Sequence, residues 1–298
     1  MRSGFCTIVG RPNVGKSTLM NALVGHKVAI TTPVPQTTRH AIRGILHVPP
    51  SAEGEAAQVV FVDTPGIHKP KTLLGSRLND TARNNLSNVD CIVFVVDGSE
   101  GIGRGDQFLA GLLADVSTPV IAVVNKIDRI SRARQLPQLQ RVAELGDWAE
   151  IIPLSAVSGE GVDVLVRQIL RRLPEGPPYF PPEQTSDQTV EQLIAELVRE
   201  QAITRMREEV PHSIAVAIDE IVPGDREDVQ VVHAVLYVER DSQKGIVIGR
   251  GGAVLREIGA NARPEIELAL GTRVFLDLRV KLMKEWQRDP RALDRLGY

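Results

Sequence analysis

Residues that can bind phosphate groups lie near the start of the chain, in a glycine-rich run that contains one lysine and one serine. The run comprises Gly10, Arg11, Pro12, Asn13, Val14, Gly15, Lys16, Ser17 and Thr18. In such a loop, backbone N–H groups surround the phosphates, the lysine reaches the β and γ phosphates, and the serine hydroxyl binds Mg²⁺. We therefore expect Lys16 and Ser17 to act on a nucleoside triphosphate.

A second polar group, Asp63-Thr64-Pro65-Gly66, directly follows an apolar run at 58–62. Taken alone, this sequence is an ordinary turn. Its position at the end of a strand, downstream of a phosphate loop, favours a metal site instead. We expect the Asp63 carboxylate to hold magnesium through water and the Gly66 amide to sense the γ phosphate.

A third group, Asn125-Lys126-Ile127-Asp128, identifies the base of the nucleotide. A fixed carboxylate at Asp128 can accept hydrogen bonds from both N1–H and the exocyclic amine of guanine, and adenine offers no such pair of donors. Ser155-Ala156 follows the apolar run 150–154, and a backbone amide there is expected to meet the guanine carbonyl oxygen. The four groups together predict a site for GTP or GDP with Mg²⁺.

Between the first two groups lies a polar stretch, residues 35–40, that has neither helical nor strand periodicity. Such a stretch is typical of a mobile loop. One of its threonines is expected to close over Mg²⁺ when GTP is bound, and we favour Thr38 over Thr37. Ordering and release of this loop by the γ phosphate would form a switch.

The elements that position these groups are predicted by five apolar runs that alternate with amphipathic helical stretches. In an α/β fold with a mostly parallel sheet and helices on both faces, ligands bind beyond the carboxyl ends of the strands. Each polar group named above directly follows such a run. The runs lie at 5–9, 58–62, 91–96, 119–124 and 150–154.

Length and composition agree with two globular domains in a cytoplasmic protein. The chain has 298 residues and a formal net charge of −2, which gives no overall indication of nucleic acid. It has no apolar stretch long enough to span a bilayer, and its first residues do not resemble a secretory signal. Cys6 and Cys91 each lie inside an apolar run, so we expect both in the core.

A proline-rich segment, residues 174–187, is predicted to be an extended linker to a small α+β module. The module begins with a helical pattern near Val190, followed by strand-like runs at 213–221 and 229–239. A glycine turn, a second helix and an alternating strand at 274–280 complete it. Pro264 lies inside the second helical pattern, where we expect a kink or break.

The glycine turn of this module, Gly249-Arg250-Gly251-Gly252, is apolar before and helical after, and it resembles the loop of a KH domain. Such a loop clamps the backbone of about four nucleotides. We expect Arg250 to neutralise a phosphate, and Val247 and Ile248 to face the bases. Lys244 and Arg256 add positive charge. The alternative is a solvated helical hairpin that has no contact with RNA.

The motifs together resemble those of the Era family of GTPases, and the resemblance covers essentially the whole chain. It is carried by GRPNVGKST, QTTRH and DTPG. It implies a P-loop GTPase domain over 1–173, the linker, and a type II KH domain over 188–298. The family is one whose DTPG-type glycine is followed by a hydrophobic residue, here Ile67, in place of a water-orienting glutamine. Intrinsic hydrolysis is therefore expected to be slow.

The resemblance also implies a role for Asn13, because in related GTPases an asparagine at this place helps to hold K⁺ in place of an arginine finger. Lys16, Asn13, Thr38 and Gly66 are then the expected catalytic residues. In the alternative interpretation, Asn13 is an ordinary loop residue.

Partners are implied by the resemblance and not by the spacing of these residues. They are the 3′ end of the small-subunit (16S-type) ribosomal RNA and the 30S subunit during its assembly. A peripheral association with the cytoplasmic face of the membrane and a monomeric state are also expected. The competing hypothesis is a nucleotide-controlled switch that binds a protein through its second module, with incidental RNA contact. A tRNA-modifying GTPase fits poorly, because no large domain precedes the motifs and no cysteine lies near the end.

Overall fold

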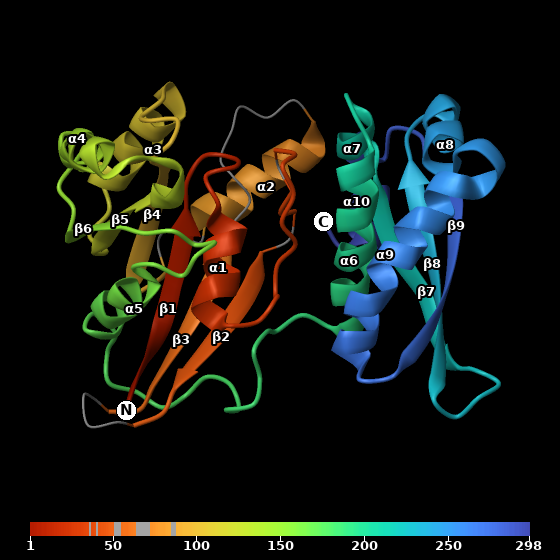
Figure 1. Ribbon diagram of the computed structural model, residues 1–298, viewed down its shortest axis with the longest axis horizontal. Coiled ribbons are helices and arrows are strands. Elements are labelled where there is room, and N and C mark those ends of the chain that lie inside the picture. Colours follow the sequence, from red (N-terminus) through yellow and green to blue (C-terminus); the bar gives the residue numbers. More distant parts are fainter. Residues whose placement is uncertain (36, 40, 51–54, 64–71, 85–87) are drawn as a thin grey trace. The chain divides into compact units, whose positions relative to one another are not determined.

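A computed structural model describes the chain except for residues 36, 40, 51–54, 64–71 and 85–87 (Figure 1). It forms two compact units. The first comprises Met1–Ala29, Thr38–Pro70 and Gly75–Asp187, and the second comprises Ile30–Thr37, Lys71–Leu74 and Gln188–Tyr298.

A six-stranded sheet forms the centre of the first unit. Its order is β2-β3-β1-β4-β5-β6, and all neighbours are parallel except β2 and β3. Five strands coincide with the predicted apolar runs, which confirms the α/β fold class; β2 was not predicted. The strands are β1 (Arg2–Val9), β2 (Ile42–Val48), β3 (Ala57–Asp63), β4 (Cys91–Asp97), β5 (Val120–Asn125) and β6 (Glu150–Pro153).

Helices cover both faces of this sheet. One core cluster joins β1 and β3 to α1 and α5, and a second joins β4 and β5 to α3 and α4. Cys6 and Cys91 are fully buried, which confirms their prediction as core residues. The described helices are α1 (Lys16–Val24), α2 (Leu73–Asn84), α3 (Arg104–Ala114), the 3-10 helix η1 (Ile127–Arg129), α4 (Arg132–Ala143) and α5 (Val162–Leu170).

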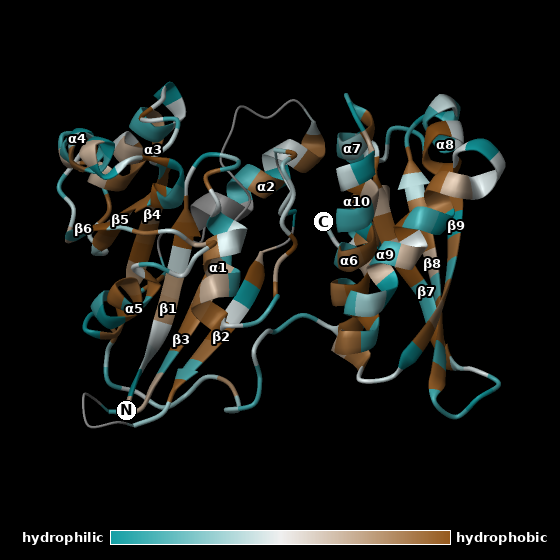
Figure 2. Cartoon of the chain, in the orientation of Figure 1, coloured by the Kyte–Doolittle hydropathy of each residue, from teal (hydrophilic) through white to brown (hydrophobic). Residues whose placement is uncertain are grey.

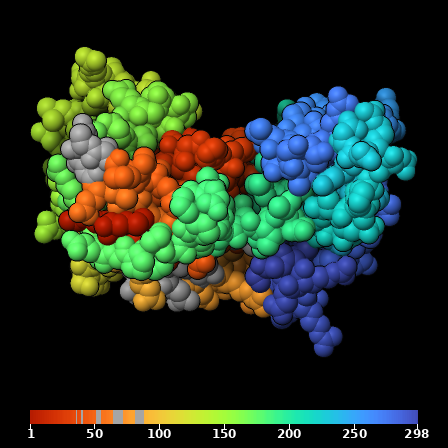
Figure 3. Space-filling view, turned by 90° about the horizontal axis from the view of Figure 1, so that it is seen from below, coloured from red at the N-terminus to blue at the C-terminus, as the bar shows by residue number. Residues whose placement is uncertain are grey.

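The proline-rich segment 174–187 is irregular and includes a turn in which the Gln184 N–H donates to the Pro181 carbonyl at 3.1 Å; it lies against the first unit (Figure 3, in green beside the red N-terminal residues). Near its ends, Glu175 bridges to Arg2 and Ser186 bridges to Gly44. Between them, the Gln58 side chain accepts from the N–H of Tyr179 at 2.6 Å. The same side chain donates to a carbonyl of the segment at 2.7 Å. The segment is therefore fixed along its length by backbone and side-chain bonds.

The second unit contains a three-stranded sheet of order β7-β8-β9, with β7 antiparallel and β9 parallel to β8. The order of its main elements confirms the predicted KH-like arrangement. Apolar residues gather where its helices meet the sheet (Figure 2). The elements are α6 (Val190–Arg205), α7 (Val210–Ser213), β7 (Ala215–Pro223), β8 (Val229–Val238), α8 (Asp241–Ile248), η2 (Arg250–Gly252), α9 (Ala253–Leu270), β9 (Arg273–Leu282), η3 (Trp286–Arg288) and α10 (Pro290–Leu296).

The predicted break at Pro264 is wrong, because α9 continues through it from Ala253 to Leu270. Pro264 is exposed, whereas Ile258, Ala262 and Ile266 are buried in the core. The proline thus lies on the solvent side, and Ala260, whose carbonyl loses its N–H partner, is exposed too, so water can satisfy that carbonyl. Among the described residues, no helix is long and apolar enough to cross a membrane.

Candidate functional site

The loop between β1 and α1 has the geometry of a phosphate cradle. Gly15 caps α1 with φ of 97°, and a Cβ there would lie 2.5 Å from Asn125 Nδ2. Glycine is therefore required at this position both for its backbone conformation and for space. The α1 N-terminus has no side-chain cap, so its N–H groups remain available to an anion.

Lys16 lies inside this loop and is almost fully buried. Its ammonium donates to the carbonyls of Gly10 at 3.1 Å and Arg11 at 3.0 Å. Burial lowers the pKa of Lys16, and the nearby carboxylate of Asp63 opposes that shift. The loop thus holds a cation whose solvation is incomplete, which favours the approach of phosphate oxygens.

Three oxygen-bearing side chains meet at the end of β3 in the arrangement expected of a magnesium site. Asp63 Oδ2 accepts from Ser17 Oγ at 2.8 Å and from Thr38 Oγ1 at 3.1 Å, and the two hydroxyls are 3.0 Å apart. Asp63 is fully buried, and its Oδ1 has no hydrogen-bond partner among the described residues. Burial raises the pKa of Asp63 above its ordinary value. The charge of Lys16 and the hydrogen bonds from the two hydroxyls oppose this shift but do not cancel it. A buried carboxylate with a free oxygen beside two hydroxyls fits a hard cation such as Mg²⁺.

The neighbouring residue Thr37 makes different contacts. Its hydroxyl lies 2.6 Å from that of Thr32 and donates to the Val34 carbonyl at 2.8 Å. Both bonds remain inside the segment Ile30–Thr37 of the second unit. The geometry therefore favours Thr38 as the metal ligand from this loop.

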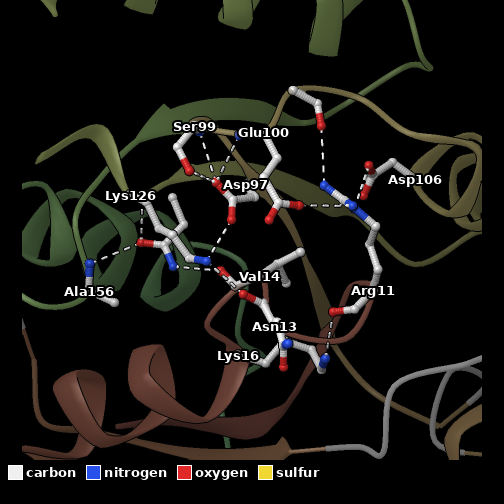
Figure 4. Close-up of polar contacts among 12 residues, drawn as sticks. Arg11, Asn13, Val14, Lys16, Asp97, Ser99, Glu100, Asp106, Lys126 and Ala156 are labelled. Carbon is white, nitrogen blue, oxygen red and sulfur yellow. Dashed lines mark hydrogen bonds and ion pairs between the residues drawn. The ribbon is translucent and has the colours of Figure 1, made fainter. Parts of the chain in front are cut away.

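On the guanine side, Asn125 joins three segments (Figure 4). Its Nδ2 donates to the Val14 carbonyl at 2.9 Å. Its Oδ1 accepts from the amides of Lys126 at 2.8 Å and Ala156 at 3.0 Å. Asn125 is buried, so these bonds fix the phosphate loop and the Ser155-Ala156 turn relative to β5.

The remaining guanine-side residues surround this centre. Lys126 Nζ donates to the Asn13 carbonyl at 2.7 Å. Asp128 lies in η1 with its side chain exposed, free to meet a base. Ser155 is buried, and its hydroxyl accepts from the Ser158 amide at 3.2 Å.

The Arg11 side chain points away from Lys16 (Figure 4). Its guanidinium pairs with Asp106 at 2.8 Å and Glu100 at 3.2 Å. It thus anchors the loop to the start of α3, and only its backbone carbonyl faces the lysine. Asn13 is exposed with φ of 65°, a conformation that asparagine tolerates well.

Two carboxylates of this network were not selected from the sequence, Asp97 and Asp106. Asp97 Oδ2 accepts from Lys126 Nζ at 2.6 Å, and its other oxygen accepts from the Ser99 hydroxyl at 2.6 Å. Burial would raise the pKa of Asp97, but the bonds from Lys126 and Ser99 lower it below its ordinary value. Asp97 is the last residue of β4. Because ligands of this fold bind beyond the carboxyl ends of the strands, its position in the sequence could have indicated it as well.

Pro12 and Thr18 are half-buried in the phosphate loop and α1. Thr64, Pro65 and Gly66 lie outside the described residues, and so does Ile67.

The glycine turn of the second unit has left-handed backbone at three positions. The φ angles are 71° at Gly249, 58° at Gly251 and 77° at Gly252. A Cβ on Gly249 would lie 2.5 Å from Val254 Cγ2, whereas a Cβ on Gly251 would meet no atom within 4 Å. Gly249 is therefore needed for packing, and Gly251 leaves open space in front of the main chain.

The side chains around this turn differ in exposure. Arg250 and Arg256 are exposed, Lys244 is half-buried, and Arg256 Nη1 donates to the Gly251 carbonyl at 2.8 Å. Val247 is fully buried in the core, so it supports the turn from within and does not face a base. Ile248 is half-buried, and Ile246, which was not predicted to contact RNA, is 52% exposed.

Comparison with protein families gives two matches. Residues 5–126 match a family described as a 50S ribosome-binding GTPase, and residues 209–287 match the KH domain. The chain is 54% identical to GTPase Era of Mycolicibacterium smegmatis, over 100% of this chain and 99% of the relative. It is 52% identical to GTPase Era of Mycobacterium tuberculosis, over 99% of this chain and 98% of the relative.

Two solved structures are similar over the whole chain. One is Era in complex with MgGDPNP and nucleotides 1506–1542 of 16S ribosomal RNA, with a TM-score of 0.95 and 42% identity, covering 100% of this chain and 99% of that one. The other is a variant of Aquifex aeolicus Era bound to GDP and AlF₄⁻, with the same TM-score, identity and coverage.

Proposed function

We propose that this chain, which belongs to the Era family of GTPases and hydrolyses GTP, uses the bound nucleotide to control binding of the 16S ribosomal RNA 3′ end during assembly of the 30S subunit. The observation that carries the proposal is the likeness, along the whole chain, to an Era structure that holds both MgGDPNP and this RNA. The open glycine turn of the second unit supports it from the chain's own geometry.

In the first unit, the residues bind, orient and neutralise the nucleotide. Lys16 approaches the β and γ phosphates, and Ser17, Thr38 and Asp63 would hold Mg²⁺, which when bound neutralises charge on the phosphate oxygens. Asn125 and Lys126 fix the loop that carries the phosphate donors. Asp128 accepts from guanine, so hydrolysis is restricted to one base.

The proposal includes slow intrinsic hydrolysis that potassium accelerates. Ile67 has no group that orients water, so positioning and charge neutralisation must come from elsewhere. Asn13 is exposed at the phosphate loop, and its side chain carries an amide oxygen, a ligand type that suits a hard monovalent cation. In this role K⁺ occupies the place of an arginine finger.

We expect faster GTP turnover in KCl than in NaCl at the same ionic strength, measured as phosphate release. The variant Asn13→Gly should turn over at equal rates in the two salts, because glycine keeps the left-handed backbone without strain and removes the ligand oxygen. Equal rates in the two salts for the wild type would contradict the potassium proposal and leave the GTPase assignment unchanged.

RNA binding is tested at Gly251, where an added Cβ would meet no atom within 4 Å. Gly251→Asp should bind nucleotides 1506–1542 of 16S RNA about 10- to 100-fold more weakly than the wild type, because a carboxylate would lie beside the phosphates. Gly251→Asn is the matched control, since it has the same shape, tolerates left-handed backbone and carries no charge. Fluorescence anisotropy in the presence of a GTP analogue and of GDP would measure both affinities.

Tighter binding with the analogue than with GDP is the expected sign of a GTP-controlled RNA-binding factor. If no variant binds RNA in either state, the second unit is better explained as a docking module for a protein, which is the competing hypothesis. The GTPase activity would stand in both cases.

Cytoplasmic location, a monomeric state and peripheral contact with the membrane form the remainder of the proposal. They rest on family membership alone. Co-sedimentation with vesicles of anionic lipid and analytical ultracentrifugation test the last two.

A further inference from the structure

The carboxylate of Asp97 lies in the nucleotide site although it belongs to none of the four sequence groups that predicted the site. Asp97 is the last residue of β4, and in the sheet it pairs with Asn125, the last residue of β5. The N–H of Gly98, the next residue, donates to the Asn125 carbonyl at 2.8 Å. The register of the two strands therefore brings the Asp97 side chain beside Lys126, the residue that follows Asn125.

The contact between Asp97 and Lys126 is short and largely shielded from water (Figure 4). Asp97 Oδ2 lies 2.6 Å from Lys126 Nζ, and the two side chains are 2% and 18% exposed. An ion pair with this burial is screened much less than a pair on the surface. The same ammonium donates to the Asn13 carbonyl at 2.7 Å. Lys126 thus connects the end of β4 to the phosphate loop.

The two oxygens of Asp97 have different partners. Oδ1 accepts from the Ser99 amide at 2.8 Å, from the Ser99 hydroxyl at 2.6 Å and from the Glu100 amide at 3.3 Å. These bonds close the turn after β4, and an asparagine side chain can make the same bonds. Oδ2 accepts from Lys126. A negative charge at this position is therefore needed for the contact with Lys126 and not for the turn.

Lys126 has a backbone conformation that lysine rarely adopts. Its φ is 66° and its ψ is 34°, in the left-handed region that favours glycine and asparagine. Its N–H donates to Asn125 Oδ1 at 2.8 Å, and its ammonium is held by Asp97. Strained residues of this kind cluster at functional sites and persist where the surrounding structure determines their position. The lysine side chain, and the carboxylate that orients it, are therefore candidates for a role in function.

From these observations we propose that Asp97 is a positioning residue for bound guanine nucleotide and acts through Lys126. By holding the Lys126 ammonium beside the phosphate loop, Asp97 keeps the guanine side and the phosphate side of the site in fixed positions. A preorganised site binds its ligand more tightly, and differences in affinity between related complexes arise mostly from the dissociation rate. The inference rests on the placement of the nucleotide in the proposed function and is independent of RNA binding.

The test measures the dissociation rate of fluorescently labelled GDP from the full chain and from the variant Asp97→Asn. Asparagine retains the turn through its oxygen and places an uncharged amide group opposite the Lys126 ammonium. GDP should dissociate about 10-fold faster, the usual effect of losing one hydrogen bond to a charged group. Affinity for GDP and for a GTP analogue should fall by the same factor, because both nucleotides contain guanine. The value of kcat at saturating GTP should stay within about twofold of the wild type.

Three further variants separate positioning from a structural role. Ser99→Ala removes the hydroxyl bond to Oδ1 and leaves the contact with Lys126, so it should release GDP at the wild-type rate. Asp163→Asn, which breaks the exposed ion pair with Arg167, should also release GDP at that rate. Lys126→Met should accelerate release. Adding Asp97→Asn to it should have no further effect, because Asp97 acts through the ammonium that is then absent.

A wild-type rate of GDP release from Asp97→Asn would overturn the inference. Release from Ser99→Ala as fast as from Asp97→Asn would also overturn it, because the turn would then be the cause. Additive effects of Asp97→Asn and Lys126→Met would show that Asp97 does not act through Lys126. If Lys126→Met itself releases GDP at the wild-type rate, the inference fails together with the proposed placement of the nucleotide. If Lys126→Met accelerates release and Asp97→Asn does not, the inference fails alone.

Discussion

Replacing Lys16 by methionine is expected to lower kcat for GTP hydrolysis by about 100- to 1000-fold, the usual cost of losing one preorganised donor to a developing oxyanion. Lys16 Nζ lies between the Gly10 and Arg11 carbonyls, directly over the phosphate cradle. Methionine has nearly the same length and fits a buried position, so the effect should report charge and not packing. Phosphate release at saturating GTP gives kcat, and binding of a labelled GTP analogue gives affinity.

The control for this experiment is Lys244→Met, a lysine of the second unit that lies outside the nucleotide site. It should retain the wild-type rate of hydrolysis. A Lys16→Met protein that binds and hydrolyses GTP at the wild-type rate would contradict the assignment of the phosphate loop itself.

Replacing Asp128 by asparagine should weaken GTP binding about 100-fold and improve binding of xanthosine triphosphate. The carboxylate accepts from two donors of guanine, and a hydrogen bond to a charged group is worth about 1.5–3 kcal/mol. An amide nitrogen at the same place instead donates to the additional carbonyl of xanthine. Asp128 is exposed in η1, so the substitution should not disturb the core.

Competition binding with the two nucleotides measures this exchange of specificity. Asp147→Asn is a suitable control, because Asp147 is also exposed but follows α4 away from the motif. If Asp128→Asn keeps a guanine preference equal to that of the control, another residue must read the base.

The sheet was predictable where its strands are buried on both faces. Runs such as Val120 to Val124 are continuously apolar, and parallel strands covered by helices require this composition. The edge strand β2 escaped prediction because Arg43 and His47 interrupt its apolar residues. Its antiparallel pairing with β3 depends on a neighbour in space, which a local pattern does not record.

For the site, the sequence predicted residue types well and side-chain partners poorly. The position of Arg11 in the phosphate-loop motif indicated a contact with the ligand, yet its guanidinium pairs with Asp106, 95 positions later. The two residues meet because β4 lies beside β1 in the sheet and α3 follows β4. Val247 was expected to face a base but is buried, and its position around helix α8 explains why. Adjacent residues of α8 point in different directions, so Val247 enters the core whereas Ile246 faces solvent.

The proline-rich segment has a consequence for how the second unit is tethered. As a free polyproline-like chain, residues 174–187 would reach about 43 Å at about 3.1 Å per residue. In the structure, the bridges near both ends and the ion pair between Asp187 and Arg43 hold the segment against the first unit, so its full length is not available to the second unit as a flexible tether. The effective concentration of the second unit is therefore set by the last anchor point and not by the segment's contour length. Residues inserted between the two bridges would form a loop at little cost and leave the tether unchanged.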